Sequence, residues 1–151
     1  MGVLNRLRSR QAGYRSRFMT IASGRDRNVT EGGAYLLHLE ISRALRIVVG
    51  ALGKVRLDAG HYIYVGSARR GIAARVARHR RLVEDKAGKL HWHIDYLLVH
   101  PRTRLVSVRF LRGAEECAWS ERIARRRGTS IEVLRFGASD CRASCRTHLY
   151  R

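Results

Sequence analysis

Residues 59–68 read AGHYIYVGSA and form the strongest β pattern in the chain, because an Ala-Gly turn leads into β-branched and aromatic residues. A second run of strand formers, GAYLLHLE at residues 33–40, follows a Gly-Gly turn. Two shorter strand candidates, residues 46–49 and residues 54–58, lie between these runs. The pattern predicts up to four strands before the first helix.

Residues 70–84 (RGIAARVARHRRLVE) change to the spacing of an amphipathic helix. Its apolar stripe consists of Ile72, Val76 and Val83, with Leu82 at the edge. Two polar side chains share this stripe, because His79 falls near its centre and Arg75 lies beside Leu82. An unpaired buried guanidinium is costly, so Arg75 either extends to the rim of the core or lines a cleft that receives an anionic group.

The second half of the chain adds a strand at residues 104–110 and a helix at residues 115–127. Glu116 lines up with the apolar face of that helix, so we expect it to point inward. Its place in the first turn is also favoured by the helix dipole, which requires no functional role. The order of elements predicts a small α+β domain over residues 29–151, with a mostly antiparallel central sheet flanked by helices.

The chain of 151 residues carries 31 Lys and Arg against 12 Asp and Glu, a net charge of +19. All but three of the cations are arginines, whose planar guanidinium suits bidentate contact with phosphate. Residues 1–28 account for +6, so +13 belongs to the remainder. Nucleic acid is therefore the first partner to consider, with DNA favoured over RNA.

Residues 1–28 are rich in arginine, poor in acids and without apolar periodicity, so we interpret them as a disordered basic tail. Their composition also suits an organelle transit peptide or a nucleic-acid-binding arm, and translation from Met19 is a third alternative. No stretch approaches the ~20 apolar residues of a membrane span, and the N-terminus lacks the apolar core of a secretory signal. We therefore expect a cytoplasmic protein without membrane contact.

Residues 91–96 (HWHIDY) allow two interpretations. As a strand, they would place His91, His93 and Asp95 on one face as candidate ligands of a transition metal. As a helix, they would let His91 and Asp95 cap and pair. The apolar run that follows favours the helix.

The three cysteines form an odd set in a chain without an export signal, which favours free thiols. A buried small hydrophobic role is the simpler explanation for Cys117. The alternative is a zinc site, because Cys141-x₃-Cys145-x₂-His148 together with Cys117 could supply four ligands.

Several of these features together resemble the GIY-YIG nuclease superfamily. They are Gly33-Ala34-Tyr35, Tyr64-Val65-Gly66, Arg75 and His79 one helical turn apart, and the inward Glu116. A closer resemblance covers nearly everything from Gly33 to Tyr150 and is to a small branch of that superfamily catalogued as a domain of unknown function. It is carried by AGHYIYVGSA (59–68), KLHWHIDYLLVH (89–100), FGASDC (136–141) and the terminal SCRTHLY.

The resemblance implies an endonuclease that hydrolyses phosphodiester bonds in DNA or structured nucleic acid with one Mg²⁺ or Mn²⁺. By position, Tyr64 matches the phenol that activates the attacking water, and Tyr35 supports the cleft. Arg75 matches the arginine that holds the phosphate, and His79 assists it. Glu116 matches the metal-binding carboxylate. We expect further substrate contacts from Gly66, Ser67, Arg69, Arg70, Arg78, His91 and His93.

The sequence departs from the superfamily pattern in three ways. Tyr35 and Tyr64 are separated by 29 positions, which requires an inserted strand pair or a long loop. Ser67 replaces a lysine that is often present, and no clear asparagine follows the glutamate helix. Tyr62 also competes with Tyr64, because alternation puts both on one face. Two hypotheses follow: a metal-dependent nuclease, or a non-catalytic nucleic-acid-binding module on the same scaffold that serves DNA repair or RNA-associated complexes.

Overall fold

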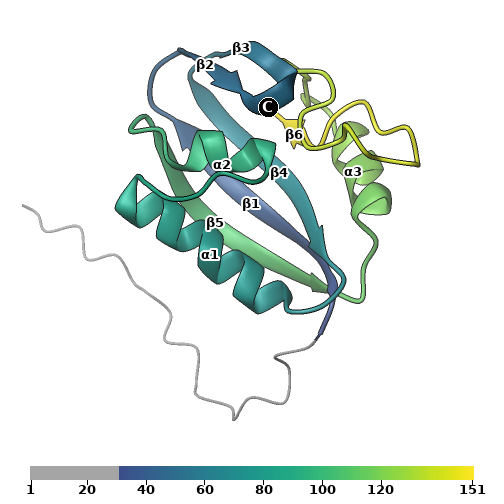
Figure 1. Ribbon diagram of the computed structural model, residues 1–151. Coiled ribbons are helices and arrows are strands. Elements are labelled where there is room, and N and C mark those ends of the chain that lie inside the picture. Colours follow the sequence, from purple (N-terminus) through teal and green to yellow (C-terminus); the bar gives the residue numbers. More distant parts are fainter. Residues whose placement is uncertain (1–30) are drawn as a thin grey trace, which may run out of the picture.

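The computed structural model describes residues 31–151 (Figure 1). The expectations for residues 1–28 and for the start at Met19 lie outside the described residues. The elements in chain order are β1 (Gly33–Ile41), β2 (Leu45–Val49), the 3-10 turn η1 (Gly50–Leu52), β3 (Gly53–Leu57), β4 (Gly60–Ala68), α1 (Ile72–Asp85), α2 (His93–Leu98), β5 (Thr103–Arg112), α3 (Glu116–Ala124) and β6 (Leu149–Tyr150).

The main sheet has four strands in the order β5-β1-β4-β6, and every neighbouring pair is antiparallel. The predicted α+β class with an antiparallel central sheet and flanking helices is confirmed. The two-residue strand β6 was not expected, because so short a segment has no periodicity of its own and is ordered by pairing with β4. Among residues 31–151, no helix combines the length and apolar character needed to cross a bilayer.

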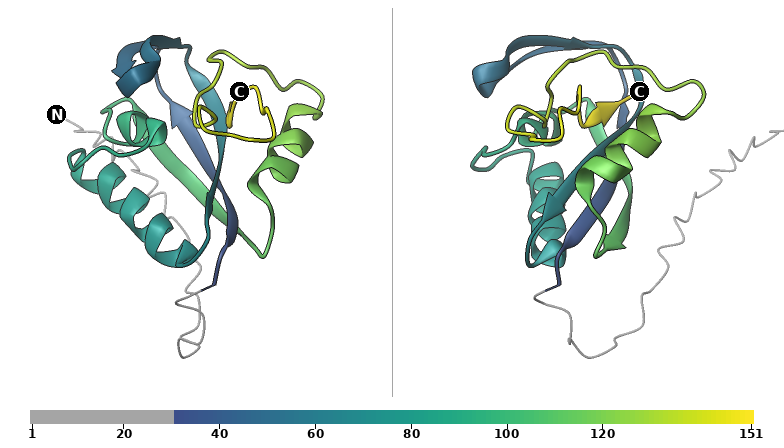
Figure 2. Two further views of the ribbon diagram at one scale, coloured as in Figure 1. Left: turned by 45° about the vertical axis from the view of Figure 1, so that its right-hand side comes forward. Right: turned by 90° about the vertical axis from the view of Figure 1, so that its right-hand side faces the viewer.

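Each face of the sheet packs against a separate helical layer (Figure 2). Alternate β1 residues such as Tyr35 and Leu37 join the larger core, together with residues of α1 and α2. The intervening Ala34 and Leu36 join a smaller core with Ile123 of α3. The alternation of β1 therefore places Tyr35 on the side of the sheet that α1 covers.

The helices predicted at residues 70–84 and 115–127 both form, but their ends differ from the prediction. On α1, Ile72, Val76 and Leu82 are buried with His79 fully enclosed among them, whereas Val83, which was also predicted to lie in the stripe, is only partly buried. The helix α3 ends at Ala124 rather than at residue 127, because the chain turns over Arg125 and Arg126, whose backbone N–H groups bond back to Glu121 and Ile123. Glu116 begins α3 and is half-buried, as its inward position predicts.

An inserted hairpin explains the long separation between the two tripeptides. Strands β2 and β3 pair with each other in a sheet of their own, joined through η1. This confirms the expected strand pair between Tyr35 and Tyr64. Leu45, Val55 and Leu57 anchor the hairpin in the larger core.

Candidate functional site

The two tripeptides lie on adjacent strands. In the β1–β4 ladder, Tyr35 is opposite Gly66 and Leu37 is opposite Tyr64. Directly opposite residues of an antiparallel pair share a face, so both phenols project from the face that α1 covers. A Cβ atom at Gly66 would lie 2.4 Å from the Tyr35 ring. The glycine is therefore required because the ring occupies the space of its missing side chain.

A line of polar groups runs inward from Tyr35. Its hydroxyl lies 2.8 Å from Nε2 of His79, and Nδ1 of His79 lies 3.5 Å from Oδ1 of Asp95. The carboxylate favours the imidazole tautomer with its proton on Nδ1, so that Nε2 accepts from the Tyr35 hydroxyl. Burial raises the pKa of Tyr35, and nearby Arg75 opposes this rise.

The Asp95 carboxylate connects α1 to the segment that begins α2 through hydrogen bonds. Arg78 donates hydrogen bonds of 2.9 Å to both carboxylate oxygens, and the N–H groups of His91 and Trp92 donate to Oδ2 at 2.7 and 3.0 Å. Burial opposes ionisation, but these donors and His79 outweigh it and hold the pKa of Asp95 well below its usual range. The sequence indicated only a cap within residues 91–96, so the link to α1 was missed.

The helical interpretation of residues 91–96 is confirmed by α2. His91 is exposed and lies against the Trp92 ring, whereas His93 accepts a 3.0 Å hydrogen bond from the Gly137 N–H through Nδ1. His93 thereby supports the C-terminal segment. The set of His91, His93 and Asp95 as ligands on one strand face does not form, since the segment is not a strand.

Arg75 lies half-buried with its guanidinium 4.1 Å from the centre of the Trp92 ring. The Arg78 guanidinium is 4.7 Å from the same ring centre. Arg78 also donates to Asp95 and to the Lys89 carbonyl. Of these two arginines, Arg75 retains donors free of hydrogen bonds and ion pairs with residues 31–151, whereas Arg78 is committed to the fold.

Glu116 of α3 influences the ionisation of both tyrosines. Burial raises its pKa above the ordinary value, while Ser67 and Arg75 act in the opposite direction. Burial also raises the pKa of Tyr64; Glu116 adds to that rise, and Arg75 reduces it. Tyr35, Tyr64, Arg75 and Glu116 are thus close enough to act on one another electrostatically. None of residues 31–151 forms a hydrogen bond with the Tyr64 hydroxyl, in contrast to that of Tyr35.

A cleft of about 920 Å³ opens beside Glu116. Its lining includes Gly33 and Ser67 from the two central strands and the exposed Arg69 and Arg142. Arg70 is exposed next to Arg69. The volume is in the range of small-molecule and cofactor sites. Glu115 and Asp140 add two further carboxylates to the lining, and carboxylate oxygens are the ligands that Mg²⁺ prefers.

Tyr62 does not share the environment of Tyr64. Its hydroxyl donates toward Glu132 Oε2 at 2.5 Å and toward the Asp58 carbonyl at 2.8 Å. Arg151 also pairs with Glu132 at 2.9 Å. These contacts engage the Tyr62 hydroxyl within the fold, and the lining of the cleft beside Glu116 includes neither Tyr62 nor Tyr64.

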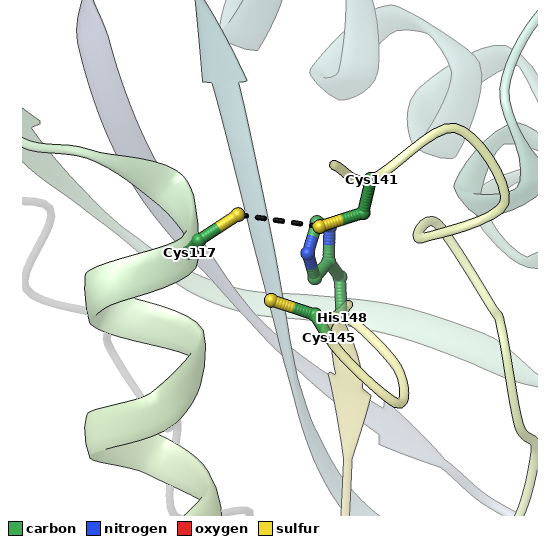
Figure 3. Close-up of side chains that lie close together, drawn as sticks. All are labelled: Cys117, Cys141, Cys145 and His148. Carbon is green, nitrogen blue, oxygen red and sulfur yellow. Dashed lines mark hydrogen bonds between the residues drawn. The ribbon is translucent and has the colours of Figure 1, made fainter. Parts of the chain in front are cut away.

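The side chains of three cysteines and a histidine lie close together (Figure 3), and Cys117, Cys141 and His148 also line the cleft beside Glu116. One ligand atom each from Cys117, Cys141, Cys145 and His148 lies within 4.8 Å of all the others. The Cys117 and Cys141 sulfurs are 3.3 Å apart, and all three cysteines are free. The sequence spacing had offered this set as an alternative, and the fold brings its members together.

Comparison with known families identifies one relationship. Residues 34–151 match the family described as "Domain of unknown function DUF123". The chain belongs to the DUF123 family. The match includes both tyrosines of the tripeptides, Glu116 and the cysteine cluster. No curated protein and no solved structure matches this DUF123 chain.

Proposed function

We propose that this DUF123 protein is a metal-dependent endonuclease of the GIY-YIG type that hydrolyses phosphodiester bonds in DNA. The observation that carries the proposal is that two buried phenols, a half-buried guanidinium and a carboxylate act on one another electrostatically, and that the carboxylate lines an open cleft. Tyr35 and Tyr64 come from paired strands, Arg75 from α1 and Glu116 from α3. These are the residue types that water activation, phosphate binding and metal binding require.

Tyr64 is the better candidate to activate the attacking water. Its hydroxyl has no hydrogen-bond partner within residues 31–151, whereas His79 engages the Tyr35 hydroxyl. Ionisation of Tyr64 is opposed by burial and by the Glu116 charge. Arg75 favours the phenolate, so it has two roles: it binds a phosphate oxygen and stabilises the base.

Glu116 and Asp140 fit a hard divalent cation, because both offer carboxylate oxygens to the cleft. Burial is the main cause of the raised pKa of Glu116, and the Asp140 carboxylate adds to it; a bound divalent cation would favour the ionised form of both groups. A bound Mg²⁺ or Mn²⁺ would supply positive charge to the phosphate and the leaving oxygen. Ser67 lies beside Glu116, where it orients the carboxylate instead of adding a cation as a lysine would.

Electrostatics supports a polyanionic substrate. The residues outside the N-terminal tail carry most of the excess positive charge, and Arg69, Arg70 and Arg142 are exposed at or beside the cleft. A charge of this kind attracts the nucleic-acid backbone regardless of sequence.

The substitution Glu116→Gln tests the proposal. Purified protein is incubated with Mn²⁺ or Mg²⁺ and with duplex, single-stranded and branched DNA, and cleavage and binding are both measured. We expect Glu116→Gln to reduce cleavage at least about 100-fold and to leave binding unchanged or tighter. Glu121→Gln is the control, since it removes an exposed carboxylate from the same helix. Binding without cleavage by the unmodified protein, under all these conditions, would instead establish a non-catalytic binding module.

A further inference from the structure

The Cys117, Cys141, Cys145 and His148 cluster has the dimensions of a tetrahedral metal site. Zinc lies about 2.3 Å from thiolate sulfur, which places two sulfurs of a tetrahedral site about 3.8 Å apart. The observed separation of the Cys117 and Cys141 sulfurs is 3.3 Å, and none of the four ligand atoms is more than 4.8 Å from another. A zinc ion therefore fits among them after small side-chain movements.

The imidazole of His148 gives an independent indication of a ligand. Its side chain is almost completely buried, and neither ring nitrogen makes a hydrogen bond within residues 31–151. A buried nitrogen without a partner costs about 1–3 kcal/mol, so such groups are rare in stable folds. Nδ1 lies 3.6 Å from Oε1 of Glu116, which leaves Nε2 for another partner. Figure 3 shows the ring beside the three sulfurs.

From these observations we infer that Cys117, Cys141, Cys145 and the Nε2 atom of His148 bind one structural Zn²⁺. Three thiolates and an imidazole complete a tetrahedral shell, so no position remains for a substrate or a reactive water. The sulfur ligands select zinc over Mg²⁺ or Mn²⁺, which prefer oxygen. This site is distinct from the carboxylates of the cleft and does not depend on the nuclease proposal.

The site explains how a long irregular segment is held in place. Residues 125–148 contain neither a helix nor a strand. Irregular segments longer than about 12–15 residues are uncommon in compact domains. Zinc would tie the first turn of α3 at Cys117 to Cys141 and Cys145 within this segment, and to His148 immediately before β6. Binding energy of this kind contributes directly to folding.

If the nuclease proposal holds, the same ion also fixes the catalytic carboxylate. Cys117 follows Glu116 directly, and Nδ1 of His148 faces Glu116. A metal-bound histidine usually donates its other N–H group to a carboxylate or carbonyl oxygen, which orients both. His148 would thus be a positioning residue for Glu116.

Metal analysis of the full-length wild-type protein tests the site. The protein is stripped of metal, reloaded with Zn²⁺ and dialysed. We expect one zinc per chain, and X-ray absorption showing three sulfurs at about 2.3 Å and one nitrogen at about 2.0–2.1 Å. The three thiols should react with a thiol reagent only after a chelator is added. A zinc content far below one per chain after reloading, or a Cys117–Cys141 disulfide in the peptide map, overturns the inference.

Variants separate this site from the proposed function. Cys145→Ser should lower the zinc content at least tenfold and the melting temperature by roughly 10 °C, whereas Ser139→Ala in the same segment should change neither. If Cys145→Ser does not fold, cobalt titration of the metal-free wild-type protein replaces it; the visible bands of tetrahedral thiolate-bound Co²⁺ support the site, and their absence overturns it. Glu116→Gln should keep its zinc even if it loses cleavage, so failure of the nuclease proposal leaves the zinc result intact.

Discussion

The hydroxyl of Tyr35 and Nε2 of His79 are 2.8 Å apart, although 44 positions separate the two residues in the chain. The contact joins the central strand β1 to the middle of α1 and continues to Asp95 at the start of α2. A phenol, an imidazole and a carboxylate are therefore aligned through the core. This alignment fixes the Tyr35 ring, whereas the hydroxyl of the buried Tyr64 makes no hydrogen bond with residues 31–151.

Removal of the Asp95 carboxylate should destabilise the fold. In Asp95→Asn, Arg78 and His79 lose their charged partner, and breaking a buried ion pair typically costs about 3–5 kcal/mol. Urea denaturation monitored by tryptophan fluorescence measures the change in the free energy of unfolding. Asp58→Asn disrupts the exposed pair with Arg56 and should cost less than about 1 kcal/mol. Equal effects of the two substitutions would contradict the structural role of Asp95.

Stability should fall in acid because of the same carboxylate. The pKa of Asp95 is lowered in the folded protein, so its contribution is complete above the unfolded pKa of about 3.9 and is lost as the pH falls toward the folded value. Urea denaturation between about pH 6 and pH 3 should show a steeper decline for wild type than for Asp95→Asn. Parallel profiles would show that Asp95 is not linked to folding.

Arg75 should matter for cleavage more than its neighbours on α1. Arg75→Ala removes the guanidinium that lies over Trp92 beside the two phenols, and we expect a loss of about 10²–10³ in cleavage rate. Arg80→Ala, which removes an exposed cation from the same helix, is the control and should change the rate less than about threefold. Similar losses in both variants would indicate a general charge effect, and Arg75 would then have no specific role.

Substitutions of Tyr64 and Tyr62 should have different effects, one on the cleavage rate and the other on stability. Tyr64→Phe removes the unpartnered hydroxyl and should reduce cleavage by about 10²–10⁴. Tyr62→Phe removes hydrogen bonds to Glu132 and to the Asp58 carbonyl, so it should cost about 1–3 kcal/mol of stability and leave the cleavage rate unchanged. A rate loss confined to Tyr62→Phe would reassign the base.

A methyl group at Gly66 should disrupt the centre of the site. It would meet the Tyr35 ring at 2.4 Å, and we expect Gly66→Ala to lose about 1–3 kcal/mol of stability together with most of the cleavage. Gly53→Ala is the comparison: the space around it is open but its φ is +80°, so it should lose about 1 kcal/mol through backbone strain and keep its activity. Full activity in Gly66→Ala would mean that the Tyr35 ring can move without consequence.

Local patterns were sufficient to predict the central part of the fold. The alternation in residues 33–40 and residues 59–68 identified the two strands that pair in the sheet, and the helical stripe identified His79 as a buried residue. The stripe also drew attention to Arg75. These signals are short-range, because the periodicity of a strand or a helix depends only on residues of that one element.

The relationships that were missed are long-range. For Asp95, the sequence revealed only its position four residues after His91. In the fold, its carboxylate contacts Arg78 and His79, which both lie on α1. The stacking of Arg75 on Trp92 likewise joins two elements. Arginine–carboxylate and arginine–aromatic pairs leave no periodic trace in a sequence, so their assignment required the fold.

The hairpin of β2 and β3 has a consequence for finding related chains. It extends from the ends of β1 and β4 that lie farthest from the opposed Tyr35 and Gly66, so strand registration, and not the number of intervening residues, sets the position of the two tripeptides. A search pattern with a fixed gap between them would pass over this chain. A pattern that scores each strand separately and lets the intervening length vary would retrieve it.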